Sequence, residues 1–414
     1  MASRFNLQRS GGIVQAAASV RRIPSLFIGQ CNAYRTSVSC VLAVAWLAAW
    51  TMALRAGERE YQGDVTDVVT IDTLDPHGPY NKIWEPYIAR WGKNHLVAVY
   101  GLQVTGKGDM GDIVCSISRD AGKTWGHRTM VFDHRMRNGT VQYAYNNAIL
   151  FRPPGQDVIW MFAMRAPMYY RDSENADLVA AYSPDGGYTW HHVELSNDYQ
   201  GSLVIVAGIE VIEREGIPVY LLPAHRNSFR HDPHGDRRQF VLESTSLLHW
   251  KLAGYVPYAD DDPVFLHEGG IATGDAEGEL MIVMRTADMQ RERPLKTPVA
   301  YSSVSTDGGR TWSTAKPQPD LPNYRSKSFF GKDAHGRQIC VYGDSVDRRG
   351  LYYKVRPAGG DWSAQRDFYV ADNRNSYPTL IEEKPGEWLA VWDSSNSKDD
   401  KRTAIRFGRL KVDK

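Results

Sequence analysis

The chain has 414 residues and carries 49 basic and 48 acidic side chains, so its formal net charge is +1. This balance excludes binding to a nucleic-acid backbone or an anionic membrane through overall charge, so a charged ligand must be held by a local cluster. Aromatic residues make up 11% of the chain, with 12 Trp and 22 Tyr. Such side chains suit packed sheet faces and sugar-stacking surfaces alike.

Residues 1–60 read as a leader. The longest apolar run of the chain extends from Cys40 to Trp50, follows several arginines and precedes small residues. Because the run is short for a membrane span, the pattern favours a secretory signal, with an uncleaved N-terminal anchor or a cytosolic protein as alternatives. We therefore expect an exported protein, secreted or periplasmic, whose folded domain spans residues 61–414.

One octapeptide, with the pattern S-x-D-x-G-x-x-W, occurs three times, as Ser118–Trp125, Ser183–Trp190 and Ser305–Trp312. The copies begin 65 and 122 residues apart, so a fourth is expected midway in the second interval. Ser244–Trp250 lies there and keeps the Trp but not the Asp and Gly, and Ala358–Trp362 is a further degenerate copy. In such a hairpin turn Asp accepts hydrogen bonds from loop amides, Gly takes a positive φ angle and Trp packs between sheets.

Short β-rich runs separate the octapeptides, for example residues 95–100, 157–162, 279–284 and 387–392. Gly, Pro, Asn and Asp divide these runs, and no long amphipathic helix is evident. Four short strands in each unit of roughly 60 residues predict an all-β fold, a six-bladed β-propeller of four-stranded antiparallel sheets. Seven blades stay open, because the first and last units carry no octapeptide.

The three octapeptides resemble the Asp-box, or BNR, repeats of the sialidase (neuraminidase) superfamily, and the similarity in pattern extends from about residue 65 to about residue 410. The resemblance implies a β-propeller with its active site at one end of the central tunnel. It indicates the fold more strongly than the activity, because the same turn occurs in propellers with other functions.

Sialidases hold an anionic sugar with clustered arginines and use a Tyr nucleophile, a Glu base and an Asp acid. The segment from His267 to Gly270, followed by a strand ending in Arg285, is similar to the family segment that carries the base and one binding arginine. The resemblance therefore nominates Glu268 as base and Arg285 as a carboxylate ligand. By the same resemblance, the nucleophile is Tyr377, a second arginine is Arg349 and the acid is Asp109.

The first predicted blade departs from the family pattern. The family has an Arg-Ile-Pro tripeptide there, whereas residues 83–88 read Ile-Trp-Glu-Pro-Tyr-Ile and place Glu85 at the equivalent position. An acid does not replace a bidentate clamp on a carboxylate, so Glu85 argues against sialic acid and instead suits the hydroxyl groups of a neutral sugar, or a cation. The tripeptide Arg22–Pro24 precedes the apolar run and so lies outside the predicted propeller.

A second set of residues suggests a different reaction. His225 and Arg165 each end a predicted strand, and His134 lies near the first loop crossing. A His or Tyr base beside an arginine that neutralises a uronate carboxylate is what β-elimination requires. The sequence therefore leaves three functions open: sialidase-like exo-hydrolysis of an anionic sugar, cleavage of a uronate-containing glycan by a propeller lyase, and glycan binding without catalysis.

The remaining expectations concern cofactors and partners. No spacing of Cys and His resembles a zinc site, so no cofactor is required, although a structural calcium stays open. The leader holds two of the four cysteines, and the sequence does not establish whether Cys115 and Cys340 pair. We expect a monomer that acts on an oligo- or polysaccharide, with no nucleic acid and no protein partner.

Overall fold

The computed structural model describes residues 61–105, 109–135, 137–138, 141–167, 176–199, 203–226, 239–259, 264–288, 298–324, 326–343, 347–396 and 402–413. The predicted leader, with the apolar run from Cys40 to Trp50, lies outside these residues. The described ranges contain strands and no helix, and thus no helix able to cross a membrane. The all-β prediction is confirmed for them.

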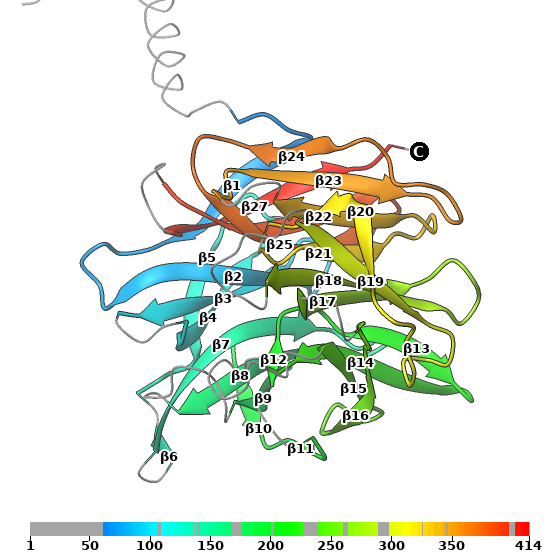
Figure 1. Ribbon diagram of the computed structural model, residues 1–414. Coiled ribbons are helices and arrows are strands. Elements are labelled where there is room, and N and C mark those ends of the chain that lie inside the picture. The colour runs from blue at the N-terminus through cyan, green and yellow to red at the C-terminus, as the bar shows by residue number, and fades with distance from the viewer. Residues whose placement is uncertain are drawn as a thin grey trace, which may run out of the picture. The chain divides into compact units, whose positions relative to one another are not determined.

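The strands form small, mainly antiparallel sheets that follow one another in chain order (Figure 1). Two sheets have four consecutive strands each: β17 (Val264–Thr273), β18 (Leu280–Asp288), β19 (Val299–Ser305), β20 (Lys316–Pro322); and β21 (Phe329–Lys332), β22 (Gln338–Gly343), β23 (Gly350–Arg356), β24 (Arg366–Val370). This meander of short antiparallel strands is the unit expected of a propeller.

Two larger sheets precede these. A nine-stranded sheet contains β2 (Tyr80–Arg90), β3 (Leu96–Val104), β4 (Gly111–Ser118), β5 (Gly126–Phe132), β6 (Arg137–Asn138), β7 (Val141–Phe151), β8 (Ile159–Pro167), β9 (Asp177–Ser183) and β10 (His191–Val193). Its two halves meet through one residue pair, Gly111 with Tyr145. A six-stranded sheet contains β11 (Ser196–Asn197), β12 (Val204–Ile205), β13 (Glu210–Arg214), β14 (Ile217–His225), β15 (Gln239–Ser244) and β16 (His249–Tyr255).

The last sheet combines the two ends of the folded region. β25 (Asn375–Lys384), β26 (Glu387–Ser394) and β27 (Ala404–Lys411) are followed in the sheet by β1 (Val65–Thr73), which pairs antiparallel with β27. Figure 1 shows β1, in blue, beside β27, in red. The arrangement is therefore a ring closed by the first strand.

The three octapeptides occupy equivalent positions, as expected, in the turns between β4 and β5, β9 and β10, and β19 and β20. In the turn at Asp185, one carboxylate oxygen accepts the Thr189 N–H at 2.9 Å, and the other accepts the Thr189 hydroxyl at 2.7 Å. The Trp190 indole donates to the Gly187 carbonyl at 3.1 Å. The boxes at Asp120 and Asp307 repeat these contacts.

The degenerate copy Ser244–Trp250, between β15 and β16, keeps the same turn although it lacks the Asp. Leu247 takes the glycine position with φ at 66°, and its N–H bonds Ser244 Oγ at 2.8 Å. The Trp250 indole donates to the Leu247 carbonyl at 3.0 Å, and its ring meets Phe162 of β8 edge to face. The fully buried Trp therefore packs one sheet against its predecessor, and this packing builds the core between sheets.

The two cysteines within the described residues, Cys115 and Cys340, are buried free thiols on β4 and β22. They form no disulfide with each other. Burial raises the pKa of both thiols to about 12. They therefore serve as small apolar core residues rather than as reactive groups.

Candidate functional site

Five strands line the centre of the ring: β2, β7, β17, β21 and β25. They lie side by side there, because β2 contacts both β7 and β25, while β21 contacts both β17 and β25. Four of these strands, β2, β7, β17 and β25, carry the same bulge: two inner-strand residues lie opposite one residue of the neighbouring strand. One non-glycine residue in each bulge has a positive φ angle. These four bulge residues are Glu85 (49°), Asn147 (54°), Glu268 (52°) and Tyr377 (52°).

The four bulges share a left-handed residue. A bulge bends its strand and can redirect one side chain, and a left-handed backbone at a non-glycine residue occurs at functional sites as well as in turns such as that of Leu247. Glu268 and Tyr377 were nominated as base and nucleophile, and Glu85 as a substrate contact. The fourth, Asn147, was not anticipated from the sequence.

Glu268 and Arg285 form the first contact of the site. Arg285 Nη1 lies 2.7 Å from each Glu268 carboxylate oxygen, and both side chains are largely buried. Burial raises the pKa of Glu268, but the guanidinium of Arg285 outweighs it, so the pKa is lowered overall. Glu268 is therefore an ionised carboxylate held by a charge-assisted pair.

Tyr377 lies among guanidinium groups. The guanidinium carbons of Arg402 and Arg348 lie 4.5 Å and 5.1 Å from its ring centroid. Burial lowers the pKa of Arg285, yet Glu268 and Tyr377 raise it overall, which places the Tyr377 phenol beside Arg285 as well. Three arginines thus surround one buried tyrosine that shares Arg285 with Glu268.

Arg348 and Arg402 lie beside Tyr377, whereas the nominated Arg349 does not contact its ring in the described residues. Arg349 is exposed, and its backbone carbonyl accepts a bond from Asn375. Arg348, one residue earlier, instead faces Tyr377 and lowers the pKa of Glu268 together with Arg285. Arg402 lies between β26 and β27, and its guanidinium also covers Trp84 at 4.9 Å.

Asp393 of β26 ties two bulges together. Its fully buried carboxylate accepts the backbone N–H of Glu85 at 3.2 Å and the hydroxyl of Ser376, the residue before Tyr377, at 2.5 Å. It also lies 3.7 Å from Arg402. Asp393 therefore positions β2, β25 and Arg402 relative to one another.

Glu85 and Lys327 are a buried pair of opposite charge. The Lys327 ammonium donates to Val206 O at 3.3 Å and Thr379 Oγ1 at 3.2 Å. Burial raises the pKa of Glu85, and Glu268 adds to that rise, whereas Lys327 opposes it. Burial also lowers the pKa of Lys327, against the pull of Glu85. The low-dielectric setting thus pushes both groups toward their neutral forms.

Asp109, the nominated acid, lies at the rim. It precedes β4, its side chain is mostly exposed, and Lys82 Nζ lies 3.5 Å from its carboxylate. Its charge acts on Glu85, which places it on the same side of the ring as the central cluster. An acid near solvent can exchange its proton with water between turnovers.

His225 belongs to the same cluster, in a supporting position. Its Nδ1 accepts the backbone N–H of Glu268 at 3.3 Å. His225 is buried and its ring lies 5.5 Å from that of His267. The contact holds the Glu268 bulge in place, so His225 positions the carboxylate.

Arg165 lies elsewhere. At the end of β8 it pairs with Asp177 at 3.3 Å, and its guanidinium covers the ring of Tyr143 at 4.6 Å. It lines a cavity of about 420 Å³ together with Phe132, Tyr145 and Asp177. Arg165 and His225 therefore have different partners, Asp177 for the arginine and the Glu268 backbone for the histidine.

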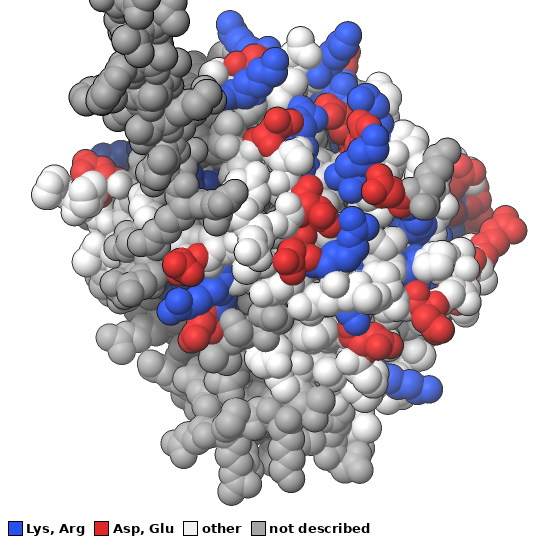
Figure 2. Space-filling model, turned by 90° about the horizontal axis from the view of Figure 1, so that it is seen from above, with Lys and Arg blue, Asp and Glu red and all other residues white. Residues whose placement is uncertain are grey.

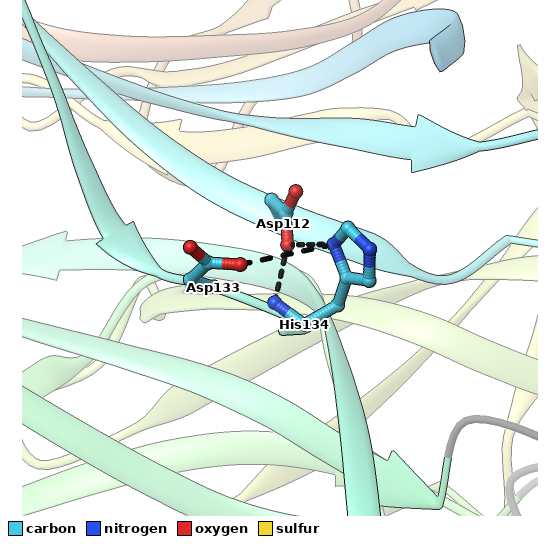
Figure 3. A group of neighbouring side chains, drawn as sticks. All are labelled: Asp112, Asp133 and His134. Atoms are coloured by element: carbon cyan, nitrogen blue, oxygen red, sulfur yellow. Dashed lines mark hydrogen bonds and ion pairs between the residues drawn. The ribbon is translucent and has the colours of Figure 1, made fainter. Parts of the chain in front are cut away.

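His134 belongs to another network, which Figure 3 shows. Its backbone N–H and its Nδ1 lie 2.5 Å and 2.7 Å from Asp112 Oδ1, and the Tyr80 hydroxyl donates to the other oxygen at 2.5 Å. Asp112, Asp133 and His134 together offer three potential metal-ligand atoms that lie within 4.8 Å of one another. Calcium prefers oxygen ligands to a histidine nitrogen, and Asp112 already has hydrogen-bond partners. We therefore interpret the group as a structural hydrogen-bond network.

A cavity of about 260 Å³ adjoins the cluster through Lys327 and Thr379. It is lined by residues of β21 and β25 and by the segment from Val206 to Glu210. Burial raises the pKa of Glu210 to about 7, opposed by the Lys332 ammonium. Outside the tunnel, basic and acidic side chains are interspersed on the face that Figure 2 shows, in keeping with the net charge near zero.

Residues 271–391 match the model of the BNR repeat-like domain, from the end of β17 into β26. No curated protein matches the chain. Among solved structures, the NanB sialidase from Streptococcus pneumoniae is similar with a TM-score of 0.61 and 10% identity, over 84% of this chain and 71% of that chain. A protein of unknown function from Dyadobacter fermentans gives 0.61 and 14%, over 85% and 99%.

The α-L-arabinofuranosidase of Fusarium graminearum, in complex with arabinobiose, gives a TM-score of 0.58 and 14% identity, over 83% of this chain and 98% of that chain. At these identities the likeness concerns the fold. The chain therefore has a β-propeller fold similar to that of these glycosidases, and part of it matches the BNR repeat-like domain, as the resemblance implied. Glycoside hydrolases of more than one sugar class share that fold.

Proposed function

We propose that the protein is an exo-acting glycoside hydrolase of the sialidase type that removes an anionic sugar from the end of a glycan. The observation that carries this proposal is the surrounding of Tyr377 by Arg285, Arg348 and Arg402, with Glu268 bound to the first of them. Solved sialidases and arabinofuranosidases among the similar structures support a hydrolase.

The charges at the site support an anionic ligand. The three arginines face the carboxylates of Glu268 and Asp393, while the raised pKa of Glu85 favours its neutral acid form. The excess of positive charge suits a carboxylate, which arginines bind in a planar, two-pronged geometry. Glu85 alone argued against such a sugar, but Arg402 brings a guanidinium to the same side of the site from another loop.

In the proposed mechanism, the Tyr377 oxygen attacks the anomeric carbon while the Glu268 carboxylate takes the phenolic proton. Asp109 gives its proton to the leaving oxygen, so the glycosidic bond breaks and a tyrosyl–sugar intermediate forms. A water then attacks the anomeric carbon, giving one proton to Asp109, and the phenol recovers its proton from Glu268. A neutral phenol suits this role because a carboxylate nucleophile would be repelled by the sugar carboxylate.

The uronate lyase is not favoured. Its proposed base, His225, binds the backbone of Glu268, and Arg165 pairs with Asp177. A panel assay separates the reactions: the protein is incubated with fluorogenic α-sialosides, β-glucuronides and α-L-arabinofuranosides, and with uronate polysaccharides. Release of the fluorophore from an acidic glycoside supports the proposal. An unsaturated uronate product, or cleavage of the neutral arabinofuranoside alone, contradicts it.

We also infer six blades. Dividing the nine-stranded sheet at its one connecting pair, Gly111 with Tyr145, leaves two groups of four strands plus β6. Each octapeptide turn then joins the third and fourth strands of one blade. An experimental structure with another division into blades would overturn this count.

Residues 1–60 are proposed to export the folded domain of residues 61–414. N-terminal sequencing of the protein recovered outside the cytoplasm tests this. A mature terminus near residue 60 supports a cleaved leader, whereas an intact Met1 on membrane-bound protein supports an anchor and recovery only from the cytoplasm contradicts export.

A further inference from the structure

Within the part of the chain that the structure describes, two of the four bulge residues have a side-chain oxygen with no hydrogen-bond partner. Glu85 and Asn147 are each 7% exposed, and Glu85 Oε2 and Asn147 Oδ1 are buried with no hydrogen bond. An unpaired buried polar atom costs about 1–3 kcal/mol, so each such atom calls for an explanation. The two atoms belong to β2 and β7, inner strands that contact each other, so we look for one explanation for both.

The backbone gives the same indication independently. Glu85 and Asn147 have φ angles of 49° and 54°, in a region where glycine is comfortable and most other residues are strained. The fold would therefore accept glycine at both bulges at lower cost. Glu268 and Tyr377 occupy equivalent bulges and point into the proposed active site, so the same device presents all four side chains.

We propose that Glu85 and Asn147 form a hydroxyl-binding subsite on β2 and β7 that recognises donor groups of the sugar, while the arginines hold its carboxylate. This inference rests on the proposed function. A carboxyl oxygen and an amide oxygen accept hydrogen bonds, so the matching ligand groups are hydroxyl or amide N–H donors. The substrate class is thus an acidic sugar that carries hydroxyl groups at a distance from its carboxylate.

The chemistry of Glu85 agrees with this role. Its backbone N–H is fixed by Asp393, and its carboxyl group faces Lys327, Glu268, Arg402 and Asp109 in the electrostatic environment of the site. A neutral carboxyl group at this point accepts through one oxygen without repelling the sugar carboxylate, which an ionised Glu85 would do. Glu85 therefore selects for hydroxyl groups without cancelling the pull of the arginines.

The test replaces each side chain by glycine, which the bulge backbone tolerates. The variants are Glu85→Gly and Asn147→Gly in the full chain, and the matched control is Glu215→Gly. Glu215 also has a positive φ, 56°, but lies exposed in the turn between β13 and β14, away from the inner strands. The substrates are the acidic glycoside that the wild-type protein cleaves fastest and its monodeoxy analogues.

We expect each subsite variant to raise KM for the parent glycoside about 3- to 10-fold, the loss typical of one hydrogen bond. The melting temperature should stay the same or rise in all three variants, and the control should leave KM unchanged. For the analogue that lacks the recognised hydroxyl, wild type and variant should have equal kcat/KM. Unchanged KM in both subsite variants, or equal losses on the parent and on every deoxy analogue, overturns the subsite.

If the wild type cleaves no glycoside, the proposed function fails and the subsite is tested by binding. Titration calorimetry with N-acetylneuraminic acid and glucuronic acid then compares wild type with the two glycine variants. Weaker binding by both variants supports the subsite. Equal binding by all three proteins, or no binding by the wild type, overturns it.

Discussion

Arg285 Nη1 lies 2.7 Å from both carboxylate oxygens of Glu268, and the two residues come from neighbouring strands of one hairpin. The arginine that could hold a substrate carboxylate is therefore already engaged by an internal one. A ligand that binds Arg285 must share it with Glu268. Its remaining donors, including the unpartnered Nε, are what the protein offers to a ligand.

Arg285→Lys should raise KM for an acidic glycoside by about 10- to 100-fold, because an ammonium keeps the charge but cannot serve Glu268 and a ligand carboxylate in one plane. Steady-state kinetics of the acidic glycoside measures the effect. Arg214→Lys is the control, since Arg214 also pairs with a glutamate, Glu243, at 2.8 Å but belongs to β13. An equal rise in KM for both variants would contradict the role of Arg285.

Tyr377→Phe should lower kcat by at least about a thousandfold while ligand affinity stays within a few fold, because it deletes the attacking oxygen and little else. Turnover and equilibrium binding of the acidic sugar are measured together. Tyr182→Phe on β9, where the ring stacks on His191, is the matched control. A nearly silent Tyr377→Phe would exclude the tyrosine nucleophile.

The octapeptide repeat specified most of the fold, because its contacts are local. The turn at Asp185 is built within five residues, so its pattern survives in the sequence and sets the phase of the blades. Glu268 and Arg285 were found for a similar reason, since they face each other across one hairpin. Tyr377 was found because the segment around it resembles the family pattern.

Arg402, Arg348, Lys327 and Asn147 were missed because their roles depend on long-range geometry. Arg402 follows the charged stretch Lys398–Lys401, which is typical of a solvated turn, and only ring closure brings it to Trp84. Arg348 and Arg349 are adjacent, and the sequence does not reveal which one faces inward. A bulge with a positive φ has no sequence signal when the residue is not glycine, so Asn147 reads as an ordinary strand residue.

Asp185→Ala should reduce the free energy of unfolding by about 1–3 kcal/mol without changing kcat, since it removes acceptors for the turn amides and the Thr189 hydroxyl. Thermal melts and kinetics of the same samples check this. Lost activity at an unchanged melting temperature would contradict a purely structural role.

The carboxylate of Asp185 should also make the stability of the protein depend on pH. Burial raises the pKa of Asp185, but the Thr189 N–H and hydroxyl outweigh it, so the pKa is lowered in the folded state. The folded form then binds fewer protons than the unfolded chain, whose Asp pKa is about 3.9. The contribution of Asp185 is therefore present above about pH 4 and is lost as the pH falls below it. The gap in melting temperature between wild type and Asp185→Ala should narrow in acid.

The titration of Glu85 should change the stability of the protein with pH in the opposite direction. Burial and Glu268 raise its pKa in the folded state, so between the unfolded value of about 4.3 and the raised value the folded form binds more protons. The stability of the wild type should therefore decline across this window as the pH rises. Glu85→Gln removes the titration, so its melting temperature relative to wild type should increase from about pH 5 to about pH 8. A constant difference would show that Glu85 is ionised throughout.

The pairing of β1 with β27 has a consequence for the order of folding during synthesis. Val65 lies opposite Leu410, so this contact joins residues separated by nearly the whole folded region. A ribosome must release the last strand before the sheet that contains Asp393 and Tyr377 can be completed. The nascent chain can form its early hairpins in isolation, but its candidate site stays open until translation ends.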